Sequence, residues 1–286
     1  KFFEPEQLRV FEELPNDELN TTIDETFAAT ATLPNAADVR VANCQTAGYC
    51  RKLTESCFRG WPTKDEVSIH QPVGAPTFEA IHDGVHLSVF DFSPESNIEL
   101  SLFFLRPADA MADDVKLQVL NVLDGQGWSE FLSEMRVGFA KHFENEVAAA
   151  ANETSWKSLA KMVKTNSWGM AYVCPRGIGP TAWNQSERKQ THHRRRFMLL
   201  GQTLDSMRVW DVRRAIRGLR SISGSKRTPI WCQAEREMSG IALYASLFER
   251  SFVKRLDLYD LPVSHKDGPT FLNVLRKTDI PLTVAF

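Results

Sequence analysis

The strongest constraint on the fold of this chain is an alternation of short apolar segments with longer amphipathic ones. Residues 115–123, 169–174, 229–233 and 253–259 are predicted to be strands, and the first of them is strongly apolar. Longer segments with helical periodicity separate them. This alternation predicts a parallel sheet with helices on both faces.

The helical segments are read from apolar residues that recur every three or four positions. We expect helices over residues 129–142, 195–219 and 238–248, and a shorter helix over 271–276. Residues 281–286 are predicted to be a last extended piece.

Two further strands precede the alternating part. Residues 85–90 and 97–106 have strand composition, and the turn-forming residues 94–97 between them predict an antiparallel hairpin. The predicted fold class is therefore α/β, with a mostly parallel, doubly wound sheet that has an antiparallel start.

The first 72 residues lack the strand-like segments of the rest of the chain. They are predicted to form a helical or irregular extension to a domain of residues 73–286. A helix is expected to begin near Pro15, because proline is favoured in a first helical turn and acidic residues follow it. A second helix is expected over 51–58.

The charge balance excludes several classes of partner. With 34 basic and 36 acidic side chains the formal net charge is −2, which gives no long-range field to attract nucleic acid. No apolar run approaches the roughly 20 residues that span a bilayer. The basic cluster 192–196 is interpreted as a solvated helix face, with an anion site as the alternative.

Five cysteines bear on the compartment and on metal binding. Cys44, Cys50 and Cys57 lie close enough in sequence for two of them to form a disulfide. Such a bond would suit a secreted or otherwise extracytoplasmic protein. These three have no metal-ligand spacing, and Cys174 and Cys232 are expected to be buried in strands. No G-x-G-x-x-G or G-x-x-x-x-G-K motif is present, so neither a metal nor a cofactor is predicted.

In a parallel α/β sheet the working site lies at the carboxyl ends of the strands. The loops 124–128, 175–183 and 233–240 occupy such positions. Four segments in this part of the chain carry a resemblance: VLNVLDGQGW at 119–128, YVCPRGIGP at 172–180, LGQTLDSMRVWDVRRA at 200–215 and AEREMSG at 234–240. In this order they resemble the α/β-hydrolase superfamily.

More narrowly, the chain resembles the acetyl-xylan-esterase-like and prolyl-oligopeptidase-like hydrolases of planctomycete-type bacteria. The resemblance implies that Gly125, Gly127 and Trp128 form the loop that supplies an oxyanion-hole amide. The alternative is a glycine-rich turn that only ends a strand. Four further residues are then expected to line the pocket: Arg176, Trp183, Glu235 and Glu237.

The turn after residue 233 decides whether such a site can be catalytic. An active hydrolase of this superfamily carries G-x-S-x-G there. Aligned on the following helix, Arg236 takes the nucleophile position, and Ala234 and Met238 replace both glycines. A guanidinium stays protonated and cannot attack an acyl carbon. Ser239 is predicted to lie inside the helix, where it is a poor nucleophile.

The remaining triad members have only weak candidates. His265 is the one histidine after Arg236, and Asp267 is near it in sequence, but the usual strand and helix between acid and histidine are missing. The resemblance places the last strand and its histidine loop beyond Phe286. A nucleophilic pair of Cys174 or Cys232 with His265 is a further alternative.

These observations predict an α/β-hydrolase-fold protein that resembles carbohydrate or acyl esterases, with a degenerate triad and a binding or structural role. One alternative is an active carboxyl-ester hydrolase that uses a non-standard nucleophile or residues beyond Phe286. Another is a subunit of a larger secreted homo- or hetero-oligomeric assembly. A carbohydrate or acyl-ester ligand is the expected partner.

Overall fold

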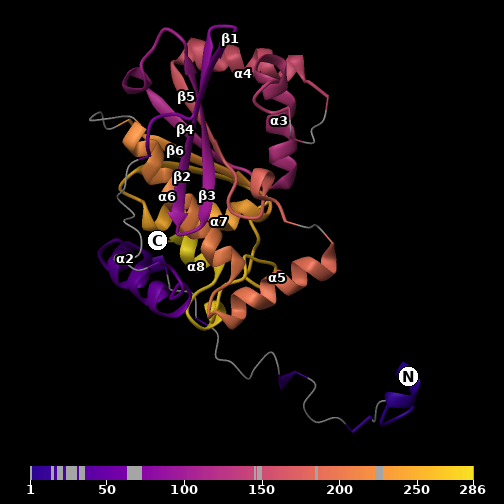
Figure 1. The fold of residues 1–286 in the computed structure, drawn as a ribbon. Helices are drawn as coiled ribbons and strands as arrows, with labels where there is room; N and C mark the ends of the chain where they lie inside the picture. Colours follow the sequence, from indigo (N-terminus) through magenta and orange to yellow (C-terminus); the bar gives the residue numbers. More distant parts are fainter. Residues whose placement is uncertain are drawn as a thin grey trace.

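The computed structural model describes residues 2–13, 16–17, 22–23, 31, 36–62, 73–144, 146, 150–183, 186–222 and 228–285. Its centre is a seven-stranded sheet (Figure 1). The strands are β1 Phe78–His82, β2 Val85–Glu95, β3 Ile98–Pro107, β4 Leu117–Val122, β5 Trp168–Val173, β6 Ile230–Glu235 and β7 Val253–Tyr259. The α-helices are α2 Ala36–Ser56, α3 Gly125–Phe139, α4 Glu153–Asn166, α5 Glu187–Leu199, α6 Leu204–Ile222, α7 Glu237–Phe248 and α8 Ile280–Ala285.

The strand order is β1-β2-β3-β5-β4-β6-β7. The first three strands are antiparallel neighbours and β3 runs antiparallel to β5, whereas β5, β4, β6 and β7 are parallel. Val122 lies opposite both Val173 and Ala234, so β4, β5 and β6 end at the same edge. The predicted α/β class with an antiparallel start is confirmed.

Helices cover both faces of this sheet. α3 and α4 contact each other, and α4 contacts β3 and β5; α6 and α7 contact each other, and α7 lies on β6 and β7. Side chains of β4 point alternately to the two faces of the sheet and so contact the helices on each face. Gln118 donates a hydrogen bond to the Leu219 carbonyl of α6, while Asn121 points to a pocket beside α3. The sheet is therefore doubly wound.

The end of the predicted N-terminal extension is part of the core. Phe58 and Trp61 are buried and their rings stack with centroids 4.4 Å apart. The Trp61 indole N–H donates to the Ser206 carbonyl at 2.7 Å. The predicted second helix is the end of the longer α2, whereas the helix start near Pro15 lies outside the described residues. The domain boundary at residue 72 stays a prediction.

Four predicted elements differ in the structure. Of the helix expected over 271–276 only a short 3-10 helix at Val274–Arg276 forms. The single helix over 195–219 is two helices, α5 and α6, because Gly201 has a φ of +71° after α5 and ends it. α6 then begins where the Thr203 hydroxyl accepts the Ser206 amide at 3.1 Å. Residues 281–286 were expected to be extended, but α8 covers most of them, since Asp279 accepts the Ile280 amide at 2.8 Å. α3 starts four residues earlier than expected.

The disulfide considered possible among the first three cysteines does not form. Cys50 and Cys57 are free thiols, and any pair among the first three cysteines includes at least one of them. Cys174 and Cys232 are buried as expected. The extracytoplasmic location stays a prediction. Over the described ranges, none of the helices has the length and apolar character needed to cross a membrane.

Candidate functional site

The three loops singled out in the sequence converge on one cavity of about 990 Å³ at the carboxyl ends of the parallel strands. The loop after β4 contributes Gly125 and Trp128 to its wall, and the loop after β5 contributes Gly177–Gly179. Glu237, at the start of α7, lines it from the third loop. The strand register explains this meeting, because the parallel strands end at one edge of the sheet.

Helix α5 closes one side of this cavity. Gln190, Arg194 and Met198 line it, and their spacing of four residues places them on one helical face. α5 has no buried residue. Of the basic cluster 192–196, only Arg194 lines the cavity and the other arginines are exposed. A solvated helix face is therefore the better interpretation of that cluster.

A buried arginine on α6 forms part of the cavity wall. Arg208 is 8% exposed, and its guanidinium lies 3.5 Å from Asp205 and 3.7 Å from Glu237. Asp205 also accepts the Thr270 amide at 2.8 Å, which ties the loop 262–270 to α6. The sequence analysis missed Arg208 and Asp205. Both residues lie in the segment 200–215, one of the four that carry the resemblance, and this position could have marked them as site residues.

The turn between β6 and α7 has a strained backbone at the position predicted for a nucleophile. Arg236 has a φ of +51° and a ψ of −126°. A non-glycine residue held in such a region costs on the order of 1–3 kcal/mol. The Arg236 amide donates to the Tyr259 carbonyl at 3.0 Å, which holds the turn against the end of β7. Ala234 and Met238, at the two positions where the resemblance implies glycine, are both buried.

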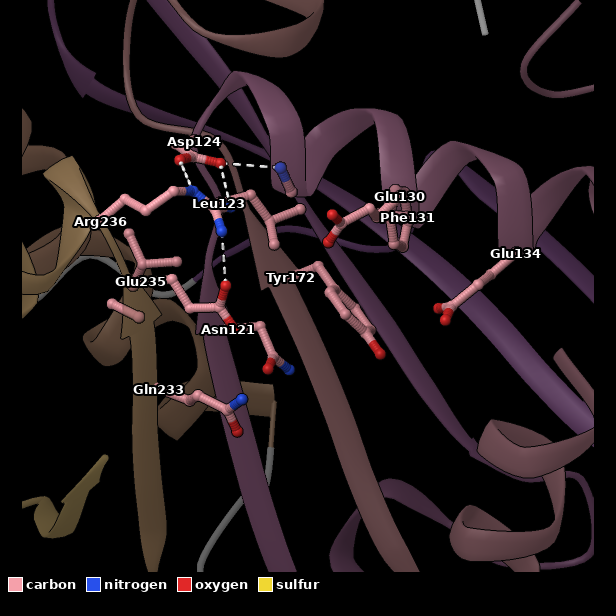
Figure 2. A pocket seen from close by; sticks show the side chains of 13 residues that line it. Asn121, Leu123, Asp124, Glu130, Phe131, Glu134, Tyr172, Gln233, Glu235 and Arg236 are labelled. Carbon is pink, nitrogen blue, oxygen red and sulfur yellow. Dashed lines mark hydrogen bonds and ion pairs between the residues drawn. The ribbon is translucent and has the colours of Figure 1, made fainter. Parts of the chain in front are cut away.

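The Arg236 side chain turns away from the large cavity and binds the loop after β4. Its guanidinium donates two hydrogen bonds to the Asp124 carboxylate, at 2.6 and 2.8 Å, and a third to Glu235 at 2.7 Å (Figure 2). These bonds keep the pKa of Arg236 raised above its ordinary value. Arg236 and Asp124 both line a second cavity of about 240 Å³, which shares no lining residue with the large one.

Asp124 also accepts a hydrogen bond from the Gly127 amide, which was expected to stabilise an oxyanion. Its carboxylate accepts the Gly127 N–H at 2.7 Å and so caps α3. Burial alone would raise the pKa of Asp124, but the hydrogen bonds from Arg236 and Gly127 outweigh it and hold that pKa below its usual range. The Gly127 amide hydrogen is therefore already bonded to a charged carboxylate. This donor is unavailable to an acyl oxygen.

The alternative nucleophiles are buried. The Ser239 hydroxyl is 0% exposed and donates to the Arg236 carbonyl at 2.6 Å. Burial raises the pKa of Cys232 to about 12 and also raises that of Cys174. None of the three presents a reactive oxygen or sulfur atom to the large cavity.

His265 uses both ring nitrogens inside the fold. Its Nδ1 lies 2.6 Å from the Pro269 carbonyl and its Nε2 lies 2.7 Å from the Tyr244 hydroxyl. The Pro269 contact requires a proton on Nδ1, so Nε2 accepts from Tyr244. Burial lowers the pKa of His265. Asp267 lies on the wall of the large cavity, so the two weak triad candidates are not paired with each other.

The four predicted pocket residues are placed in different surroundings. Glu237 lines the large cavity and Glu235 the smaller one. Arg176 is buried and bound bidentately to Asp211, at 2.9 and 2.6 Å. The Trp183 ring packs on Gly177 and on His193 of α5, with a ring-centroid distance of 4.9 Å to the histidine. Both residues hold loops in place.

Comparisons with known proteins address the fold. No family model matches the sequence, and a search of curated proteins finds no relative. Among solved structures, a Bacteroides fragilis protein provisionally named an acetyl xylan esterase superposes with a TM-score of 0.62 at 11% identity. The match covers 96% of this chain and 72% of the other. This chain has the α/β-hydrolase fold.

Other solved structures with the α/β-hydrolase fold are matched less closely. The acetyl xylan esterase from Paenibacillus sp. R4 gives a TM-score of 0.43 at 11% identity, over 79% of this chain and 60% of the other. The glucuronoyl esterase from Solibacter usitatus gives 0.44 at 13% identity, over 80% and 64%. The fold assignment rests on the Bacteroides protein alone, and its 11% identity leaves the activity of this chain open.

Proposed function

We propose that this chain is an α/β-hydrolase-fold protein that binds a carbohydrate or acyl-ester ligand in the large cavity without hydrolysing it. The observation that carries this proposal is the Arg236–Asp124 pair. The residue at the strained turn is a permanent cation, and its partner carboxylate occupies the Gly127 amide. Nucleophile and oxyanion donor are therefore lost together.

The composition of the cavity supports a polyhydroxylated ligand. Its wall mixes carboxylates, cations and amides on three sides, including Glu237, Arg208 and Gln190, and Trp128 adds an aromatic edge. Hydroxyl groups can donate to carboxylates and accept from guanidinium and amide groups. The carbohydrate ester in the provisional name of the Bacteroides protein belongs to the same chemical class.

We expect the wild-type protein to hydrolyse p-nitrophenyl acetate no faster than a heat-denatured sample, and Arg236→Ser to do the same. The variant gains a hydroxyl but still lacks a paired histidine, and Asp124 still caps α3. Release of the chromophore at 405 nm measures the rate. Turnover of about 1 s⁻¹ or more by the wild type, as in ordinary enzymes, would overturn the proposal.

Ligand binding is tested separately. Acetylated xylo-oligosaccharides should bind the wild type, with the heat of binding measured by isothermal titration calorimetry. Removing the Gln190 amide in Gln190→Ala should weaken binding about fivefold, since one hydrogen bond contributes about 1 kcal/mol. Arg188→Ala, an exposed change on the same helix outside the cavity wall, is the control. Equal losses in both variants would contradict a ligand in this cavity.

A further inference from the structure

The smaller cavity has chemistry of its own. It lies between α3 and the carboxyl-terminal parts of β4 and β6, beside the Arg236–Asp124 pair. Figure 2 shows Glu130 and Glu134 extending into it from α3, with Tyr172 and Gln233 on the strand side. Its volume of about 240 Å³ is suited to a small molecule.

The charges lining this cavity are unbalanced. Four carboxylates and one guanidinium line it: Asp124, Glu130, Glu134, Glu235 and Arg236. The guanidinium is already bound to Asp124 and Glu235. Within the described part of the chain, Glu130 accepts a hydrogen bond only from the neutral Gln126 amide, at 2.9 Å. Among the residues that the structure describes, Glu134 has no cationic partner. The cavity thus carries a surplus of negative charge.

The hydroxyl of a largely buried tyrosine provides a second, independent observation. Tyr172 is 7% exposed and lines the cavity, and within the described part of the chain its hydroxyl, whose oxygen is not fully buried, forms no hydrogen bond. The Phe131 ring packs against the Tyr172 ring with centroids 4.7 Å apart, and Figure 2 shows the hydroxyl end directed to the cavity.

These two observations limit the ligand. Stacking on a sugar needs a free aromatic face, and the Tyr172 ring already packs against Phe131. In the described ranges, His, Cys, Asp and Glu side chains form no group of three or more suited to a metal ion. A compact group with several N–H donors and a positive charge matches the carboxylates of Glu130 and Glu134 together with a hydroxyl that can accept.

We propose that this cavity binds a small organic cation with a primary ammonium group, held by Glu134, Glu130 and the Tyr172 hydroxyl. This site is distinct from the large cavity of the proposed function, and neither depends on the other. The ammonium would donate to both carboxylates and to the phenol oxygen, and the phenol proton would then face Gln233 or solvent. No bond is broken or formed in this binding.

The test is a titration of the full chain with 1,4-diaminobutane, followed by calorimetry at low and at high salt. We expect saturable binding that weakens as salt rises, and no binding of butane-1,4-diol, which has the same chain length without charge. Glu134→Gln should weaken binding at least tenfold and Tyr172→Phe about threefold. Glu153→Gln, an exposed change on α4, should leave it unchanged.

Thermal unfolding of each variant shows whether it is folded, and Glu134→Gln keeps the size of the side chain, so its loss of binding would report charge. Three outcomes would overturn the proposal: no saturable diamine binding by the wild type, equal binding of the diol, or unchanged binding by Glu134→Gln. Preference for the diol would indicate a neutral polyol site.

Discussion

Replacing Asp211 with alanine is expected to lower the free energy of unfolding by about 3–5 kcal/mol. Asp211 on α6 is 0% exposed and accepts three hydrogen bonds from Arg176: one from its amide at 3.0 Å and two from its guanidinium. The Arg176 guanidinium also contacts Glu95, at the end of β2. Without Asp211, a buried cation and a buried amide lose their main partner.

The effect should extend to the large cavity. Arg176 precedes Gly177–Gly179 in the cavity wall, and its carbonyl accepts a hydrogen bond from Arg208 at 3.3 Å. Guanidinium chloride unfolding monitored by tryptophan fluorescence measures the loss. The control is Lys157→Ala, which removes the exposed pair with Glu153 and should cost less than about 1 kcal/mol. Similar losses in both variants would show that the Asp211 pair does not stabilise the fold as expected.

The sequence predicts the parallel part of the sheet well because strand and helix periodicity are local properties. Each strand from β4 to β7 was located from its local composition, and a parallel sheet then places the ends of these strands together. The convergence of three loops on one cavity follows from that placement. The strained turn at Arg236 was likewise located by its position between a strand and a helix.

The partners of the site residues could not be predicted in the same way. Arg236 and Asp124 are 112 residues apart, and the sequence does not show which way a long side chain turns. Arg176 was expected in the pocket because it lies on a site loop, but the carboxylate of Asp211, 35 residues later, holds it in the interior. Local patterns fix where a loop is, whereas ion pairs depend on distant charges.

The second large effect concerns the ion pair between Arg236 and Asp124. Asp124→Ala is expected to lower the free energy of unfolding by about 2–3 kcal/mol. It removes the cap on α3, which contributes about 1 kcal/mol, and the charge-assisted bonds to Arg236. Arg236→Ala should cost less, because Asp124 keeps the Gly127 amide and the Arg236 side chain is already 30% exposed.

The double variant isolates the interaction itself. If the pair fixes the turn to the loop after β4, the double-mutant cycle of Asp124→Ala and Arg236→Ala should give a coupling energy of about 1–3 kcal/mol. Denaturant unfolding at pH 7 measures all four corners of the cycle. Additive losses would mean that the two side chains act independently, and the turn would then be held by backbone contacts such as the Arg236 amide bond to Tyr259.

The same pair should also respond to acid, with a direction fixed by the pKa of Asp124. Hydrogen bonds from Arg236 and Gly127 hold this pKa below its usual range, whereas the unfolded chain titrates at about 3.9. The stabilisation by the charged carboxylate is therefore fully present above about pH 5 and is lost as the pH falls through the lower, folded value.

Asp124→Asn keeps a helix-capping oxygen but has no charge to titrate. The difference in unfolding free energy between wild type and Asp124→Asn should thus be constant from pH 7 to about pH 5 and shrink below about pH 4. A difference that stays constant to pH 3 would show that the charge on Asp124 does not hold Arg236 in place.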